Sequence, residues 1–160
     1  MVDTLERDSF IKQRAAQALA KAGITEPPTD LYGVADLYGI IVRQGSLPPG
    51  VAGEYDRVSN TITLGAFDRW PLAHELGHAL LSHGDQRCYE KAATSDVPLD
   101  EMDMGVPFEG EANRFARYLL VPRIWLAAEW KEEATPPEIA RKLGVSERVI
   151  WLAALGYRLV

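Results

Sequence analysis

Residues 74–78 read His-Glu-Leu-Gly-His, so two histidines are four positions apart and a glutamate directly follows the first. In an α-helix, positions four apart lie about 40° apart around the axis, at ~100° per residue. Both imidazoles then face the same side of the helix, one turn apart, which is the spacing that one metal ion needs for two nitrogen ligands. Glu75 could reach a water molecule at that metal. This pattern is typical of zinc-dependent hydrolases, in which the glutamate is the general base.

The surrounding sequence favours a real site over a chance match. Asp68 is a suitable N-cap, and Pro71 falls in the first turn, where a missing N–H does little harm. The segment 68–82 is apolar on most sides, which is typical of a buried helix. Two histidines and a glutamate in a buried helix are costly unless something satisfies them, and a metal ion does so.

The third ligand of such a metal is not a histidine. A catalytic zinc takes three protein ligands and leaves one position for water. The remaining histidine, His83, follows His78 by five residues, about 140° around the helix, so it cannot share the metal while the helix continues. The longer pattern HExxHxxGxxH is excluded, because this chain has Leu81 and Gly84 where the pattern needs glycine and histidine. We therefore expect a carboxylate from a later helix.

Glu109 is the best candidate for that carboxylate. Glu109 and Asn113 are four positions apart and share a helix face, so Glu109 could bind the metal while Asn113 hydrogen-bonds the outer nitrogen of a liganding histidine. Glu111 points about 200° away from Glu109 on the same helix. We therefore interpret Glu111 as a solvated acid of the first turn.

The pattern of apolar residues, glycines and prolines predicts the elements that position these residues. Helices are expected at 4–22, 31–38, 68–82, 109–120, 122–130 and 135–144, the last opened by a capping box of Thr135 and Glu138, and strands at 40–43, 51–55 and 61–64. We predict an α+β, mostly helical fold. A small antiparallel sheet (residues about 40–64) packs on the HExxH helix and a second, glutamate-bearing helix. A single metallopeptidase domain (1–160) would comprise a zinc peptidase unit (30–130) and a helical C-terminal segment (131–160).

The segment between the two motif helices is acidic. Residues 84–108 have no steady period and are expected to form a long loop. From Gly84 to Glu111 there are eight acidic and two basic residues. This segment is interpreted as a solvated connector, and the alternative is a rim that attracts a basic protein substrate.

Residues 139–150 resemble a helix-turn-helix. Ala140, Gly144, Val145 and Ser146 occupy the positions that this motif requires. A recognition helix needs exposed polar and basic residues, whereas the second helix here is mostly apolar. Residues 131–160 carry five basic and four acidic groups, too nearly balanced for a DNA footprint. We therefore expect packing helices and no direct binding of nucleic acid.

Composition agrees with a soluble cytoplasmic protein. The chain has 160 residues, a formal net charge of −6 and a single cysteine, Cys88. An acidic chain is not expected to bind nucleic acid, and one cysteine excludes an internal disulfide. Residues 1–10 carry charges and no apolar stretch, so we expect no signal peptide. No apolar run approaches the ~20 residues of a membrane span.

The two motif segments together resemble the ImmA/IrrE metallopeptidases. That family has HELGH followed, on the next helix, by E-x-x-A-[DN]-x-F-A-x-x-L-L-x-P, and residues 74–78 and 109–122 match both halves. The resemblance covers residues 30–155. It implies a compact gluzincin-like fold, a zinc ion bound by His74, His78 and Glu109, and Glu75 as the general base.

The resemblance also implies a substrate. Known members cut a helix-turn-helix repressor and so switch on phage, mobile-element or DNA-damage genes. Two other interpretations stay open: a metal-containing regulator that binds a protein without turnover, and a DNA-binding regulator that uses the C-terminal helices. Two nitrogens and one carboxylate suit Zn²⁺, and Mn²⁺ is not excluded. Tyr55, Tyr89 and Tyr118 are candidates for stabilising the oxyanion, although a structural role is the favoured interpretation of each. An edge of the hairpin 51–64 is a candidate for pairing with substrate.

Overall fold

Helices and a small sheet make up the computed structural model, which describes residues 4–82, 86–89 and 108–160. The helices are α1 (Thr4–Lys21), α2 (Leu31–Leu37), α3 (Arg69–Leu80), α5 (Glu109–Leu120), α6 (Arg123–Lys131), α7 (Pro136–Leu143) and α8 (Glu147–Gly156). The strands are β1 (Ile41–Gln44), β2 (Val51–Asp56), β3 (Thr61–Leu64) and β4 (Gln86–Tyr89). The predicted α+β class is confirmed. Within the described residues, no helix is both long enough and apolar enough to cross a lipid bilayer.

The sheet is mixed, which corrects the prediction of an antiparallel sheet. Its strand order is β1-β3-β2-β4, with β2 antiparallel to both of its neighbours and β1 parallel to β3. The predicted hairpin of β2 and β3 is present. The chain reverses between β1 and β2, and β3 then inserts between them, so β1 and β3 run in the same direction. Apolar alternation predicts strands but not which strand becomes the neighbour of which.

Strand β4 lies in the segment that the sequence predicts to be a loop. It pairs with β2 through four residues, Gln-Arg-Cys-Tyr, with an irregularity in the register between Val51 and Gly53. These four residues show no clear alternation of apolar and polar side chains, so the pairing is imposed by the neighbouring strand. His83 and residues 90–107, which hold most of the acidic segment, lie outside the described residues.

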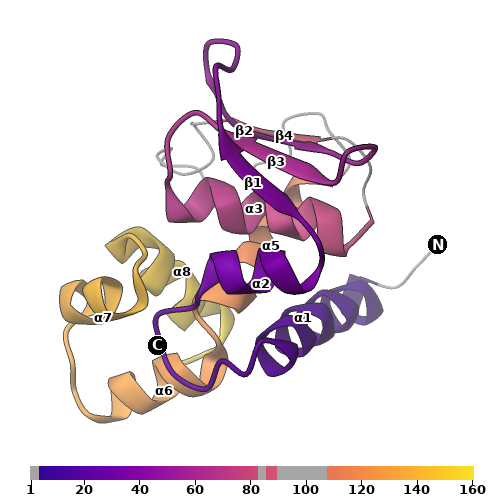
Figure 1. Cartoon of the computed structure of the whole chain (residues 1–160). Helices are drawn as coiled ribbons and strands as arrows, with labels where there is room; N and C mark the ends of the chain where they lie inside the picture. The colour runs from indigo at the N-terminus through magenta and orange to yellow at the C-terminus, as the bar shows by residue number, and fades with distance from the viewer. Residues whose placement is uncertain (1–3, 83–85, 90–107) are drawn as a thin grey trace.

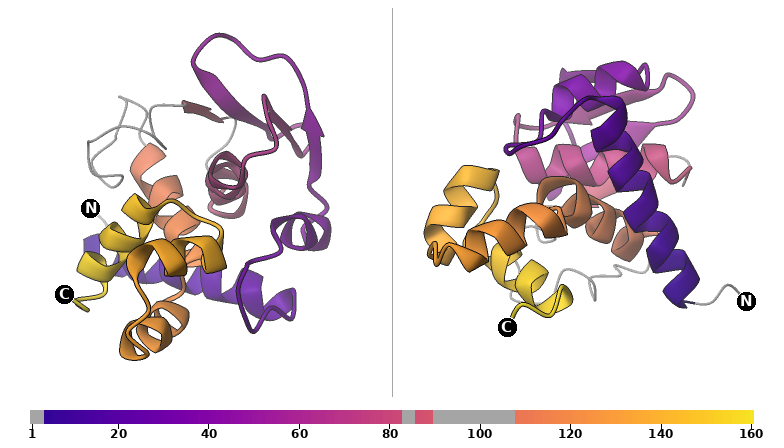
Figure 2. Two further views of the ribbon diagram at one scale, coloured as in Figure 1. Left: turned by 90° about the vertical axis from the view of Figure 1, so that its left-hand side faces the viewer. Right: turned by 90° about the horizontal axis from the view of Figure 1, so that it is seen from below.

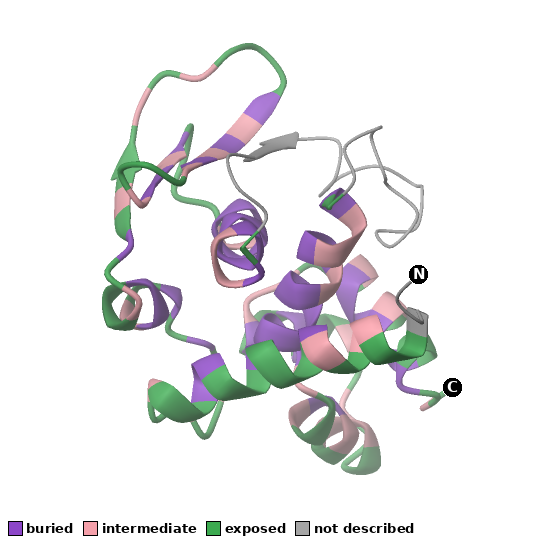
Figure 3. Cartoon of the chain, turned by 90° about the vertical axis from the view of Figure 1, so that its right-hand side faces the viewer, coloured by how far each residue is buried: buried purple, intermediate pink, exposed green. Residues whose placement is uncertain are grey.

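Helix α3 lies between the sheet and α5, and α5 in turn lies between α3 and α1. Figure 1 shows the sheet above α3, with α5 behind it and α1 below. In Figure 3, α3 is coloured as buried around most of its circumference, and every residue from Pro71 to His78 is buried. The predicted buried helix is therefore present, with Asp68 at its N-cap position, although the Asp68 side chain makes no capping hydrogen bond. Burial on all sides explains why α3 lacks a polar stripe.

The C-terminal helices gather at the end of the molecule remote from the sheet, as Figures 1 and 2 show. The predicted capping box opens α7, where the backbone N–H of Thr135 donates to Glu138 Oε2 at 2.8 Å. In α8 the buried residues are Val149, Ile150, Ala153 and Ala154. The hydroxyl of Tyr157 donates to the Val121 carbonyl at 2.7 Å. The apolar face of α8 is thus used for packing.

Thr29 joins the loop before α2 to the end of α5. This threonine is fully buried, and its hydroxyl donates to the Leu119 carbonyl at 2.7 Å. The last four carbonyls of a helix have no partner within the helix, so this bond satisfies one of them. Arg69, the first residue of α3, donates to the Thr29 carbonyl at 3.0 Å and to the Gly144 carbonyl at 3.1 Å. These bonds connect α3, α5 and α7.

We expect Thr29→Val to lower the free energy of unfolding by about 1–3 kcal/mol, because a buried carbonyl loses its donor while the side-chain volume hardly changes. Urea denaturation of the purified chain measures this. Thr29→Ser keeps the hydroxyl and should retain most of the stability. Equal midpoints for Thr29→Val and the wild type would show that the bond contributes nothing.

Candidate metal centre

Three donor atoms from two helices converge in the interior. On α3, His74 Nε2 and His78 Nε2 are 3.1 Å apart. On α5, Glu109 places Oε2 at 2.9 Å from His74 Nε2 and Oε1 at 2.9 Å from His78 Nε2. The histidines are 0 % exposed and Glu109 is 1 % exposed. The helical spacing of four residues therefore directs both imidazoles to one point.

The spacing of these donors fits a small metal ion. Donors at ~2.0–2.1 Å from a tetrahedral zinc are about 3.3 Å from one another. The observed separations of 2.9 to 3.1 Å are close to this value. Glu109 Oε1 is buried and faces His78 Nε2. The His74–His78–Glu109 set is the group of metal-capable side chains found in the described part of the chain.

Asn113 fixes the tautomer of His74. The Asn113 side-chain oxygen lies 2.6 Å from His74 Nδ1, and both residues are buried. An amide oxygen only accepts hydrogen bonds, so His74 carries a proton on Nδ1, and in the neutral ring the lone pair is on Nε2. That lone pair faces a carboxylate oxygen at 2.9 Å. Two acceptors at this distance repel each other unless a proton or a cation lies between them, and a divalent cation satisfies both.

The carboxylate of Glu109 is held in its charged form. Burial by itself raises the pKa of Glu109, but hydrogen bonds and positive charge from His74 and His78, when their Nε2 atoms carry a proton, outweigh it and lower the pKa to about 2. A cation that takes the place of those protons would meet a carboxylate that is already charged.

Glu75 lies against the sheet at a position where β2 has no side chain. A Cβ built on Gly53 would be 3.2 Å from Glu75 Cγ and 3.6 Å from Glu75 Oε1. Glu75 is 0 % exposed. The strand therefore leaves space for the glutamate, and a larger residue at position 53 would have to displace it. Gly53 gave no signal in the sequence, because its importance arises from a contact between distant segments.

Gly77 sets the distance between the two ligand-bearing helices. A Cβ on Gly77 would lie 3.1 Å from the Ala112 Cα, 3.2 Å from the Ala112 carbonyl oxygen and 3.2 Å from the Phe115 Cβ. Two of these atoms belong to the backbone of α5, which cannot yield as a flexible side chain can. The backbones of α3 and α5 thus approach closely at this point, one residue before His78.

For the neighbouring residues, the structure corrects the expectation for Glu111 and agrees with the structural interpretation of two tyrosines. Glu111 is not a solvated acid, because it accepts two hydrogen bonds from Arg7. The hydroxyls of Tyr55 and Tyr118 donate to Asn60 and Asp8, respectively, so both serve structural bonds. The side chain of the third tyrosine candidate, Tyr89, lies outside the described residues.

The hairpin of β2 and β3 has no free edge, which corrects the expectation that a substrate could pair with it. Strand β1 covers β3, and strand β4 covers β2. Among the described strands, β1 and β4 are at the two edges of the sheet, so a peptide that adds to it would pair with one of these.

We expect Asn113→Ala to weaken metal binding by about 10- to 100-fold, because His74 loses the partner that orients its ring. Competition with a chromophoric chelator measures the dissociation constant. Asn113→Asp keeps an acceptor for the Nδ1 proton and should bind metal more tightly than Asn113→Ala. Equal affinity of Asn113→Ala and wild type would contradict this role.

We expect Gly77→Ala to lower the free energy of unfolding by about 1–3 kcal/mol, because the added methyl group overpacks the contact between α3 and α5. Metal affinity should fall as well, since Glu109 moves away from the histidines. Gly156→Ala in α8 is the matched control, because its Cβ would have Arg117 Nη2 as nearest atom at 3.7 Å. Alanine there should be neutral or stabilising by about 0.5–1 kcal/mol. A Gly77→Ala protein as stable as Gly156→Ala would show that the helices do not need this contact.

Comparison with known proteins agrees with this geometry. A search of curated proteins found no match. Among solved structures, a Mycobacterium tuberculosis transcriptional regulator aligns with a TM-score of 0.62 at 20% sequence identity, over 92% of this chain and 48% of that chain. That likeness concerns the fold, and this chain spans about half the length of the mycobacterial protein. The family model for the IrrE N-terminal-like domain, Peptidase_M78, matches residues 67–153, which is more than half of the chain and includes both ligand-bearing helices. The chain therefore belongs to the Peptidase_M78 family of IrrE N-terminal-like domains.

Proposed function

We propose that the protein is a zinc-dependent endopeptidase in which His74, His78 and Glu109 bind one metal ion and Glu75 is the general base. The observation that carries the proposal is the convergence of three buried donors within 4.8 Å of one another. Membership of a peptidase family supports the same conclusion. The site has the two nitrogens and one carboxylate that leave a fourth position open in catalytic zinc centres.

When bound, the zinc would lower the pKa of a water molecule and polarise the carbonyl of the peptide to be cut. Glu75 follows His74 directly on α3 and accepts the proton of the attacking water. Its complete burial keeps its carboxylate out of bulk water. Asn113 holds the His74 ring, so this imidazole presents Nε2 and retains its proton on Nδ1.

The donor set suits zinc better than magnesium, calcium or manganese. Imidazole nitrogens suit zinc, whereas all-oxygen sites suit magnesium, calcium and manganese. Mn²⁺ could also bind, and its weaker affinity for nitrogen sites would show as a higher dissociation constant in the same titration.

We further propose that the substrate is a helix-turn-helix repressor, whose cleavage relieves repression of phage, mobile-element or stress-response genes. The motif resemblance to ImmA/IrrE peptidases supports this substrate class. The chain carries a net charge of −6, and DNA-binding repressors have basic surfaces, so the two charges are complementary. The fold neighbour is described as a transcriptional regulator, which agrees with a role in gene control. Such a substrate would place the reaction in the cytoplasm.

We expect Glu75→Gln to keep the metal and the fold but to abolish cleavage, since only the base is removed. His78→Ala and Glu109→Gln should lose the metal, because each removes a ligand. Metal analysis of the purified variants and of the wild type, for which we expect about one zinc per chain, measures these differences. A wild-type chain that cannot be loaded with zinc would contradict the proposed centre.

The substrate is tested separately by co-expression with the repressor encoded beside the gene, followed by mass spectrometry of the repressor. A single cut with wild type and none with Glu75→Gln supports the proposal. A repressor that is bound by both proteins and cut by neither would instead identify a regulator that acts without turnover.

A further inference from the structure

The first turn of α5 depends on contacts from outside the helix. Glu109 is the first residue of α5, and Phe108 at the N-cap position makes no side-chain capping bond. The first N–H groups of a helix have no partner within the helix, and helix ends fray. The direction of the Glu109 carboxylate is therefore set by what holds this turn in place.

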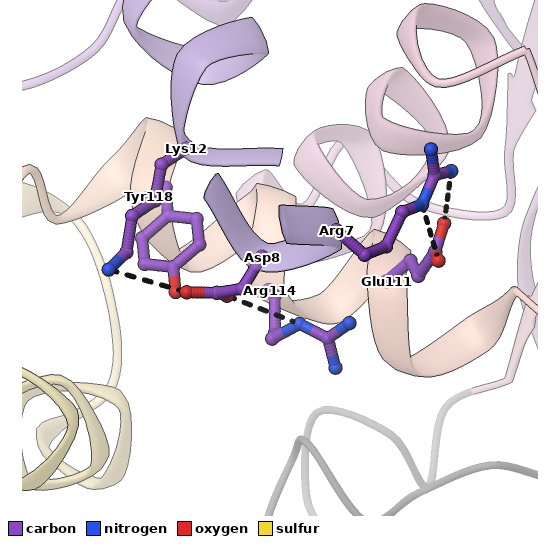
Figure 4. Close-up of polar contacts among 6 residues, drawn as sticks. All are labelled: Arg7, Asp8, Lys12, Glu111, Arg114 and Tyr118. Carbon is purple, nitrogen blue, oxygen red and sulfur yellow. Dashed lines mark hydrogen bonds and ion pairs between the residues drawn. The ribbon is translucent and has the colours of Figure 1, made fainter. Parts of the chain in front are cut away.

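Arg7 of α1 holds the same turn through Glu111. Its Nε lies 2.7 Å from Glu111 Oε2, and its Nη2 lies 2.6 Å from Glu111 Oε1, so the guanidinium makes a two-pronged contact. Figure 4 shows the Arg7 side chain reaching from α1 to α5. The side chains are only 30% and 16% exposed. Bidentate arginine–carboxylate pairs fix geometry as well as charge.

The turn is therefore held from two opposite sides. Glu109 and Glu111 point about 200° apart on the helix. Glu109 contacts the histidines of α3, whereas Glu111 contacts Arg7 of α1. We propose that Arg7 is a positioning residue of the metal centre, which keeps the Glu109 carboxylate directed at His74 and His78 by holding Glu111. The inference rests on the proposed metal site, and it assigns a role to α1, which precedes the segment matched by the family model.

The neighbouring residue on α1 provides a control within the same interface. Asp8 accepts a hydrogen bond from the Tyr118 hydroxyl at 2.7 Å, and it lies 3.3 Å from Lys12 Nζ and 3.6 Å from Arg114 Nε. These contacts are drawn beside the Arg7 pair in Figure 4. Tyr118 lies nine residues after Glu109, about 13.5 Å along the helix axis at 1.5 Å per residue. Removing its hydroxyl weakens the contact of α1 with α5 without touching the first turn.

The test compares Zn²⁺ dissociation constants of the purified full chain, measured by competition with a chromophoric chelator. Arg7→Met keeps a flexible aliphatic side chain and removes the guanidinium, whose central carbon lies 4.7 Å from the centre of the Phe10 ring. We expect Arg7→Met and Glu111→Gln each to weaken zinc binding about tenfold, which corresponds to about 1.4 kcal/mol. Tyr118→Phe should lower the stability to urea but leave the zinc dissociation constant within about twofold, because the first turn is intact.

A double-variant cycle separates positioning from direct ligation. If Glu111 acts only through Arg7, the double variant Arg7→Met with Glu111→Gln binds zinc as well as either single variant does. If Glu111 were itself a ligand, Glu111→Gln would weaken binding further in the Arg7→Met background, and the inference would be wrong. The visible absorption of the Co²⁺-loaded chain reports donor geometry and should change in Arg7→Met but not in Tyr118→Phe.

Two results would overturn the inference while leaving the proposed function intact. One is an unchanged zinc affinity in Arg7→Met, and the other is an equal loss of affinity in Arg7→Met and Tyr118→Phe, which would indicate general loosening of the interface. A wild-type chain that binds no zinc would instead refute the proposed function and, with it, this inference.

Discussion

The close approach of α3 and α5 at Gly77 determines where the donors of the metal centre lie. Two of the donors are on α3 and one is on α5, so their separation depends on the distance between the helix axes. Helices packed through ordinary side chains are about 8–10 Å apart, and a glycine permits the lower end of that range. Because Gly77 faces the backbone of Ala112, the histidines and Glu109 come within hydrogen-bond distance of one another. The sheet, α1 and the C-terminal helices pack around α3 and α5 and stabilise their arrangement.

Burial of the donor side chains carries a cost in free energy. Taking a carboxylate and two imidazoles out of water costs several kcal/mol unless charges and hydrogen bonds are matched. Asn113 satisfies one imidazole nitrogen, and the histidines keep the Glu109 carboxylate charged. When the two Nε2 atoms carry no proton, what remains is a set of lone pairs directed at one point, which a divalent cation satisfies. Folding and metal binding are therefore expected to be coupled in this domain, as in other metal sites buried in a core.

Local signals in the sequence were enough to place most elements and the motif residues. The spacing of His74 and His78, the capping residues of α7 and the glycine that ends it each act within a few residues, and local rules describe them well. Glu109 and Asn113 were brought together with His74 because their spacing of four places them on one face of a helix. The structure agrees with these local inferences.

Contacts between distant segments were not predictable in the same way. The insertion of β3 beside β1, the pairing of β4 with β2 and the space that Gly53 leaves for Glu75 all depend on how the chain folds back on itself. The contact of Arg7 with Glu111 joins residues 104 positions apart. The sequence shows which face of the helix Glu111 occupies, but it does not show which other helix covers that face. It therefore predicts a solvated residue at this position. A charged residue on the helix face opposite a ligand can therefore help to position the ligand. In this fold, the helix that contacts such a residue is α1.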